Sequence, residues 1–257
     1  MEFVDRTNLL LQRRRDRLLS SRLDASLYSE RSSFAVAVER LSEALEQDLN
    51  SYLAEPELQN MTAHVSRVTA TLDAQAMLPF PTTFNADSTL ACLAYALCRA
   101  LRPRTAVETG VAYGVTSAMI LAALHKNRHG TLHSIDLPPL RERASGQHIG
   151  VMVPPEYKSF WQLHCGTSWR VLPKLLANGL GEIGLFIHDS SNLQRIQKLE
   201  LELMWPHLTS YAAIIVNNIG RGSAFAEFVT HKRINCWFTI EQRGKRGDVT
   251  GIIVRRP

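Results

Sequence analysis

The apolar positions of the chain alternate between helix-like and strand-like runs from residue 87 onward. Residues 87–101 (DSTLACLAYALCRAL) form an apolar stretch long enough for a helix, which Asp87 or Ser88 can cap and which Pro103 ends. Shorter apolar runs follow at 105–108, 131–136, 158–165, 183–189 and 211–216. Each of them has the length and composition of a buried strand. Strands separated by helices predict an α/β fold with a mostly parallel sheet.

Both ends of the chain differ from this central alternation. Two β-rich runs at 236–240 and 251–254 flank a charged turn and predict a C-terminal antiparallel hairpin. Residues 1–71 have a mostly helical pattern, and we expect a helical extension over 1–80 before a core over 81–257. An amphipathic helix cannot shelter its apolar face alone, so the extension should pack on the core or on a second subunit. We expect a homodimer, because closed two-fold assemblies are the commonest oligomers.

Two helices of the predicted core have apolar faces that can be identified from spacing. The helix that begins at Val115 should present Met119, Ala122 and Ala123 on the same side as Val115. The helix at 191–208 should bury a face made of Leu193, Ile196, Leu199 and Leu203. Each of these two helices is therefore expected to have one apolar face.

Composition indicates one substantial domain with an appendage. The 257 residues are 45% hydrophobic and 21% charged, which is typical of a globular protein. There is no long uncharged apolar run and no secretory signal pattern, so we expect no membrane segment and a cytoplasmic protein. The four cysteines lack metal-ligand spacing and are expected to be buried free thiols: Cys92, Cys98, Cys165 and Cys236.

The formal net charge of +5 is concentrated in two clusters. The early cluster is Arg13, Arg14, Arg15 and Arg17, and the late one is Arg243, Lys245, Arg246, Arg255 and Arg256. A nucleic-acid groove would favour interleaved aromatic side chains, which the late cluster lacks. We therefore interpret these charges as solvated surface and expect no nucleic-acid partner.

The segment 105–117 (TAVETGVAYGVTS) is the centre of the chemistry. It predicts a buried strand, a tight loop between Gly110 and Gly114, and the start of a helix. Glu108 at the end of the strand suits a cationic or hydroxyl-bearing ligand better than a pyrophosphate. Asp136 ends the next strand, where an acidic residue can accept hydrogen bonds from both ribose hydroxyls. A strand-end aspartate with a structural role is the alternative.

These motifs resemble those of class I S-adenosylmethionine-dependent methyltransferases. The E-T-G-x-x-x-G stretch is similar to their motif I, and G-T-S-x-x-x-L-P at 166–173 is similar to the stretch that borders the adenine. F-I-H-D-S at 186–190 and E-L-E-L-M-W-P-H-L at 200–208 look like a bacterial small-molecule, O-methyltransferase-like branch. The resemblance implies a Rossmann-like sheet and S-adenosyl-L-methionine as cofactor. It assigns the cofactor to Glu108, Gly110, Tyr113, Gly114, Asp136, Thr167 and Ser168.

The same resemblance implies the catalytic residues. Asp189 and His188 end the fourth strand and are the candidates for a general base, although His188 can equally be a packed, hydrogen-bonded histidine. Metal-dependent relatives use Asp, Asp and Asn at positions that correspond here to Asp189, Asn217 and Asn218. One carboxylate with two amides makes a poor Mg²⁺ site, so we expect no metal. Relatives also carry a histidine and a tyrosine where this chain has Asn192 and Gln194.

The long segment at 137–157, rich in proline and glycine, is a candidate substrate lid. Arg141, His148 and Tyr157 are its candidate residues. Together these features predict methyl transfer to a small-molecule acceptor, at oxygen and without metal. The alternative is a cofactor-binding protein of the same fold without methyl transfer: a binding module, a partner subunit or a non-redox catalyst. A nicotinamide-dependent enzyme is disfavoured because the G-x-G-x-x-G spacing is missing.

Overall fold

The computed structural model describes residues 32–75, 77–137, 148–191, 193–242 and 248–257. Its centre is a seven-stranded sheet of order β3-β2-β1-β4-β5-β7-β6. The strands are β1 (Thr105–Thr109), β2 (Thr131–Asp136), β3 (Trp161–Cys165), β4 (Ile183–His188), β5 (Leu208–Val216), β6 (Trp237–Glu241) and β7 (Val249–Arg255). Strands β1 to β5 run parallel, and β7 pairs antiparallel with both β5 and β6. The predicted α/β sheet with an antiparallel C-terminal pair is thus confirmed.

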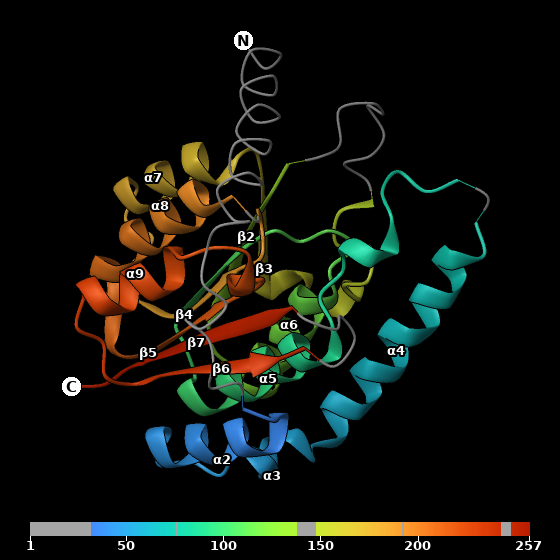
Figure 1. The fold of residues 1–257 in the computed structure, drawn as a ribbon. Coiled ribbons are helices and arrows are strands. Elements are labelled where there is room, and N and C mark those ends of the chain that lie inside the picture. Colours follow the sequence, from blue (N-terminus) through green and yellow to red (C-terminus); the bar gives the residue numbers. More distant parts are fainter. Residues whose placement is uncertain (1–31, 76, 138–147, 192, 243–247) are drawn as a thin grey trace.

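Helices cover both faces of the sheet (Figure 1). The helices are α2 (Phe34–Leu45), α3 (Leu49–Leu53), α4 (Pro56–Asp73), α5 (Ser88–Leu101), α6 (Val115–Asn127), α7 (Ser168–Ala177), α8 (Gln194–Met204) and α9 (Ala224–His231). Short 3₁₀ turns lie at η2 (Thr82–Phe84), η4 (Pro155–Phe160), η5 (Trp205–His207) and η6 (Ile219–Arg221). Helices α7, α8 and α9 close one apolar core, and α5 and α6 close the other with help from α2, α3 and α4. Within the described ranges, none of these helices combines the length and apolar character needed to cross a membrane.

Helix α6 is buried on nearly all sides, because α4 and α5 pack around it. The prediction of a single apolar face on this helix was therefore too narrow. A helix that is apolar all round belongs in a core, and residues 118–124 of α6 are all buried. Its neighbour α5 begins as predicted, where Asp87 Oδ1 accepts a hydrogen bond from the Leu90 N–H at 3.0 Å.

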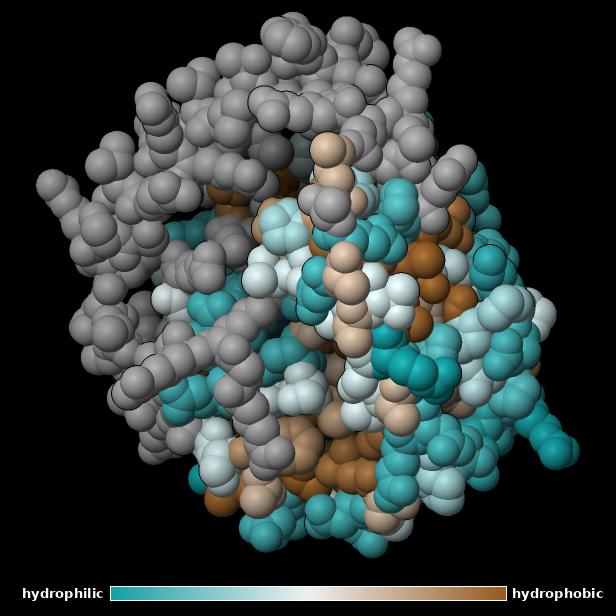
Figure 2. All heavy atoms as spheres, turned by 90° about the vertical axis from the view of Figure 1, so that its right-hand side faces the viewer, coloured by the Kyte–Doolittle hydropathy of each residue, from teal (hydrophilic) through white to brown (hydrophobic). Residues whose placement is uncertain are grey.

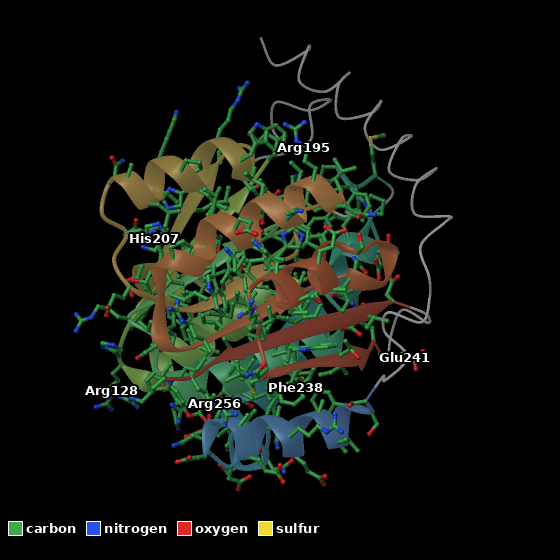
Figure 3. The ribbon with its side chains drawn as sticks, turned by 60° about the vertical axis from the view of Figure 1, so that its left-hand side comes forward. Arg128, Arg195, His207, Phe238, Glu241 and Arg256 are labelled. Atoms are coloured by element: carbon green, nitrogen blue, oxygen red, sulfur yellow. The ribbon has the colours of Figure 1, made fainter. Side chains whose placement is uncertain are left out.

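The N-terminal helices are fixed to the core by polar contacts as well as apolar ones. Arg99 of α5 forms a bidentate ion pair with Glu55, just before α4, at 2.7 and 2.8 Å. The Tyr95 hydroxyl donates to the same carboxylate. At the β6 edge of the sheet, Phe238 and Arg256 lie beside α2 (Figure 3). Arg256 Nη1 donates a hydrogen bond to the Ala44 carbonyl of α2 at 3.4 Å. Helices α2, α3 and α4 therefore pack on the core, which is one of the two alternatives given for the extension.

Two expectations need correction, and one helix was not predicted. Helix α8 begins at Gln194 and buries Glu200 and Gln197 together with Ile196, whereas Leu199 is 37% exposed. Helix α9 lies in a segment for which the sequence pattern gave no prediction. Cys98 is buried as predicted, but Cys165 is exposed because it ends the edge strand β3. The two basic clusters fall mainly on residues 13–17 and 243–246, outside the described residues.

Candidate active site

A cavity of about 980 Å³ opens at the carboxyl ends of the central strands. One wall consists of residues 110–112 after β1, Asp136 at the end of β2, residues 189–191 after β4, and Asn218 after β5. The opposite wall comes from α4 and from residues 80–92. The strand order reverses between β1 and β4, and ligands of open α/β sheets bind at such a switch point. The side of the molecule that carries α4 shows apolar side chains in recesses between polar ones (Figure 2).

Gly110 allows the loop after β1 to pass very close to the end of β4. Its φ is +86°, and a Cβ at this position would lie 2.3 Å from the carbonyl oxygen of Asp189. No other residue can take that place without moving the backbone. The Gly110 N–H donates to the Ile135 carbonyl at 2.9 Å, which ties the loop to β2. The glycine predicted for ligand contact thus lines the cavity and also sets its shape.

Asp136 lies in the cavity wall as predicted, but the loop already uses much of its carboxylate. Oδ2 accepts hydrogen bonds from the N–H groups of Val111 and Ala112 at 2.9 and 2.8 Å, and Oδ1 accepts from the Leu137 N–H at 2.7 Å. Burial raises the pKa of Asp136, and these N–H groups oppose that rise by stabilising the charged form. The side chain therefore holds the loop in place in addition to any contact with a ligand.

Tyr113 and Gly114 support the loop from behind and do not line the cavity. The Tyr113 ring stacks on Phe80 with centroids 4.1 Å apart, and its hydroxyl donates to the Phe80 carbonyl at 2.6 Å. Gly114 lets residue 150 approach, since a Cβ on Gly114 would lie 2.7 Å from the Gly150 Cα. Both residues shape the site without facing it.

Glu108 is completely buried beneath the loop and is absent from the cavity wall. Its Oε2 accepts hydrogen bonds from Ser117 at 2.5 Å and Ser134 at 2.7 Å, whereas Oε1 has no hydrogen-bond partner among the described residues. Burial raises the pKa of Glu108 to about 8, although the two serines pull it down. The carboxyl group is therefore mostly protonated at neutral pH.

Thr167 and Ser168 lie at the start of α7 and also stay outside the cavity wall. The Thr167 side chain does not cap the helix, and its buried Oγ1 lacks a hydrogen-bond partner among the described residues. Ser168 is buried and hydrogen-bonds to Glu200. Neither side chain predicted beside the adenine lines the cavity, and Ser168 instead bonds to a buried carboxylate.

His188 points into the protein and forms a buried ion pair with Glu200 of α8. Its Nδ1 lies 2.7 Å from Glu200 Oε2, and the two side chains are 1% and 0% exposed. Burial opposes the charged form of His188, but Glu200 outweighs it and the pKa of His188 is raised. Burial likewise opposes the charged form of Glu200, yet His188 with Ser168 and Thr109 lowers the pKa of that carboxyl. The packed, hydrogen-bonded alternative for His188 is the one the structure supports.

Asp189 lines the cavity, and β5 holds its carboxylate. Asn217 Nδ2 donates to Asp189 Oδ1 at 2.5 Å. Asn217 Oδ1 is itself occupied, because it accepts from the Asn218 N–H at 2.9 Å and from Gln242 Nε2. Asn218 also lines the cavity, and its buried Oδ1 has no hydrogen-bond partner among the described residues. The strand ends therefore bring Asp189, Asn217 and Asn218 together as the sequence predicted.

Two of the three candidate lid residues fall within the described part of the chain. His148 and Tyr157 do not line the cavity, and the Tyr157 ring packs near His125 of α6 with centroids 5.0 Å apart. The nearby segment 148–153 packs on the loop instead, where the Gly150 N–H donates to the Ala112 carbonyl at 3.0 Å. Arg141 and Asn192 lie outside the described residues.

Two parts of the site were not predicted from the sequence. The first is Glu200, which belongs to the motif at 200–208 but received no predicted role. The second is the wall that α4 supplies through Thr62, Val65, Ser66 and Thr69. The spacing of those four residues, at three, four and seven positions, places them on one helix face and could have indicated a shared surface. No local pattern marks Glu200, since its partners come from other strands and helices.

Comparison with known proteins agrees with this geometry. Residues 107–219 match a family model described as a methyltransferase domain. A search of curated proteins found no match. Solved structures with a similar fold include the O-methyltransferase TomG of Streptomyces achromogenes, crystallised with SAM. It is 16% identical with a TM-score of 0.54, over 78% of this chain and 90% of that chain.

Two further structures are similar to the same extent. The O-methyltransferase of Bacillus cereus, solved with SAH, is 11% identical with a TM-score of 0.55, over 86% of this chain and 97% of the other. The SAH-bound methyltransferase PaMTH1 of Podospora anserina is 12% identical with a TM-score of 0.52, over 76% and 87%. At these identities the likeness is one of fold. Over residues 107–219 this chain is therefore similar to a methyltransferase domain, and the chain has the Rossmann-like fold of these methyltransferase structures.

Proposed function

We propose that this protein transfers the methyl group of S-adenosylmethionine to the oxygen of a small-molecule acceptor without a divalent metal. The observation that carries the proposal is the cavity at the switch point of the sheet, within a methyltransferase domain. Its walls combine the close-packed loop at Gly110 with two carboxylates, Asp136 and Asp189. The likeness to methyltransferases solved with SAM or SAH supports this cofactor.

The residues present fit such a cofactor. Asp136 stands at the end of β2, where an acidic residue can accept hydrogen bonds from ribose hydroxyls. Asn218 offers a buried oxygen without a hydrogen-bond partner among the described residues, and buried polar atoms normally have one. A bound molecule with a donor group would satisfy this oxygen, because Asn218 lines the cavity.

The chemistry requires alignment and a destination for one proton. When bound, S-adenosylmethionine supplies an activated methyl group, so that an acceptor oxygen forms the new O–C bond as the S–C bond breaks and its electron pair stays on sulfur. Asp189 lines the cavity and is the group that would take the acceptor's proton. Asn217 fixes the Asp189 carboxylate, and the cavity walls orient the reactants.

The donor set at the strand ends does not fit a magnesium ion. Asn217 Oδ1 already accepts two hydrogen bonds and has no lone pair left for a metal. Mg²⁺ also demands near-ideal octahedral coordination and usually binds carboxylates, whereas two of these three positions are amides. The described residues hold no cluster of three or more His, Cys, Asp or Glu side chains suited to a metal. We therefore propose metal-independent transfer.

Calorimetry tests this proposal in two steps. The purified protein should bind S-adenosylhomocysteine and should bind NAD at least tenfold more weakly. The same protein, titrated with MgCl₂ after treatment with EDTA, should show no saturable binding. Tight NAD binding without a response to S-adenosylhomocysteine would refute the cofactor. Once binding is established, a library of acceptors with methyl-labelled cofactor separates transfer from a protein that only binds.

A further inference from the structure

Glu200 is the centre of a buried hydrogen-bond network directly behind the cavity wall. It lies on α8 and has no exposed surface. Its Oε2 lies 2.7 Å from His188 Nδ1 and accepts from Thr109 Oγ1 at 2.5 Å, and its Oε1 accepts from Ser190 Oγ at 2.8 Å. Ser168 of α7 adds a further hydrogen bond. One carboxylate thus connects β1, β4, the turn after β4, and α7.

The partners of His188 determine its charge. Nδ1 faces the Glu200 carboxylate, and Nε2 lies 3.1 Å from the carbonyl oxygen of Ser191. The Ser191 carbonyl oxygen can only accept a hydrogen bond, so Nε2 carries a proton. Nδ1 faces a carboxyl group that already receives three hydroxyl donors. The raised pKa of His188 and the lowered pKa of Glu200, each caused by the other group, favour a proton on Nδ1 as well. The pair is an imidazolium and a carboxylate enclosed in the interior.

Three consecutive residues of the cavity wall are fixed by this pair and its neighbour. Asp189, Ser190 and Ser191 all line the cavity. Glu200 holds the Ser190 side chain, and His188 holds the Ser191 carbonyl. The Asp189 N–H donates to the Thr109 carbonyl at 2.8 Å. The hydroxyl of the same threonine donates to Glu200, so Thr109 links the Asp189 backbone to that carboxylate. The segment that carries Asp189 is thus held from the interior at each of its residues.

We propose that Glu200 and His188 are positioning residues, which fix the turn 189–191 as one wall of the ligand cavity. This inference rests on the proposed function, since it takes the cavity as the cofactor site and Asp189 as the proton acceptor. The charge matters because a carboxylate can accept four hydrogen bonds through two oxygens. A glutamine of the same shape has one oxygen and an NH₂ group, which cannot accept from Ser190 or from an imidazolium.

The test compares Glu200→Gln with Glu202→Gln as a matched control. Glu202 lies two residues further along α8, is partly exposed, and pairs with Lys232 at 2.7 Å on the surface. Calorimetry with S-adenosylhomocysteine on folded protein should show affinity lowered at least tenfold in Glu200→Gln and within twofold of wild type in Glu202→Gln. Hydrogen exchange should become faster in peptides that span 188–193 of Glu200→Gln, while β1 and β5 keep their protection.

A purely structural role predicts a different result. Folded Glu200→Gln would then bind S-adenosylhomocysteine within twofold of wild type and exchange at 188–193 as wild type does, which would overturn the proposal. If wild type itself fails to bind S-adenosylhomocysteine, the proposed function falls, and the exchange comparison alone decides the positioning role. Should Glu200→Gln not fold, nitrogen NMR of wild-type His188 at neutral pH remains. Protons on both ring nitrogens support the pair, and a neutral ring overturns it.

Discussion

Glu108 and Glu200 are two buried carboxyl groups on opposite faces of the sheet beside β1, and their pKa values are shifted in opposite directions. Both are 0% exposed. Glu108 of β1 points toward α6, where it meets Ser117, and the next residue, Thr109, points to the other face and meets Glu200. Adjacent residues of β1 thus belong to the two carboxyl environments: Glu108 itself on one face of the sheet, and Thr109, the partner of Glu200, on the other.

The neighbours of each carboxyl explain the difference. Burial dominates at Glu108, because two neutral hydroxyls cannot offset the loss of water, and its pKa is raised to about 8. At Glu200 burial acts in the same direction, but a protonated His188 reverses it and the pKa is lowered. Depth alone therefore does not set the charge of a buried group. A neighbouring cation decides whether a buried carboxyl group stays protonated and neutral or is ionised.

The largest effect should come from breaking the charged pair. Glu200→Gln should lower the free energy of unfolding by about 3–5 kcal/mol, the usual result of leaving a buried charge without its partner. The depressed pKa of Glu200 contributes stability above the ordinary value of 4.5, and the raised pKa of His188 contributes it below 6.5. The free energy of unfolding should be measured with urea at pH 6, which lies between these two values, where both contributions are present.

Glu202→Gln is the control for this loss. Its surface pair with Lys232 should contribute at most about 1 kcal/mol. Wild-type stability should also fall on both sides of the window, as Glu200 is protonated at low pH and His188 loses its proton at high pH. Equal losses in the two variants at pH 6 would show that Glu200 carries no buried charge.

The second effect tests the neutral carboxyl. A raised pKa means that folded Glu108 keeps its proton when the unfolded chain has lost it, so stability is highest below pH 4.5 and declines up to about pH 8. The decline should be about 1.4 kcal/mol per pH unit in that interval. Glu108→Gln mimics the neutral form and should lack this slope. The difference between wild-type and variant unfolding curves from pH 5 to pH 8 measures it, and parallel curves would contradict a neutral Glu108.

This contrast also shows what the sequence could and could not predict. The strand, glycine loop and helix at 105–117 were predicted because apolar spacing and glycine act locally. The strand-end positions of Asp136, Asp189 and Asn218 followed from the same pattern, since parallel strands end on one edge. These features depend on residues close together in the chain.

Glu200 could not be predicted for the opposite reason. Helix α8 was assigned an apolar face that included Leu199, because spacing rules treat a glutamate as a surface residue. Only the fold brings His188 and Thr109 to Glu200, from 12 and 91 positions away. The sequence likewise could not show that the Asp136 carboxylate binds its own loop, because that contact depends on how tightly the loop closes.

The third effect extends the comparison to the two amides after β5. Asn217 makes hydrogen bonds to Asp189, Asn218 and Gln242, so Asn217→Ala should lower the free energy of unfolding by about 1–3 kcal/mol. Asn218 has a φ of +56° and an unpartnered Oδ1, so Asn218→Gly removes no described contact of that oxygen and suits the backbone. Its unfolding free energy should stay within about 0.5 kcal/mol of wild type. Similar losses in both variants would mean that Asn218 is bonded after all.

The smallest effect concerns the hydroxyl donors, and its pH dependence distinguishes the two carboxyls. Ser117→Ala removes one hydrogen-bond donor to Glu108. It should lower the free energy of unfolding by about 1 kcal/mol at pH 6, where that carboxyl is neutral, and by roughly twice as much at pH 9, where it is ionised. Thr109→Val removes a donor to Glu200, which is ionised at both pH values, so its cost should be the same at pH 6 and pH 9. Urea unfolding of the two variants at these pH values gives four differences from wild type. A cost for Ser117→Ala that does not change with pH would place Glu108 in the same charge state as Glu200 and remove the contrast between them.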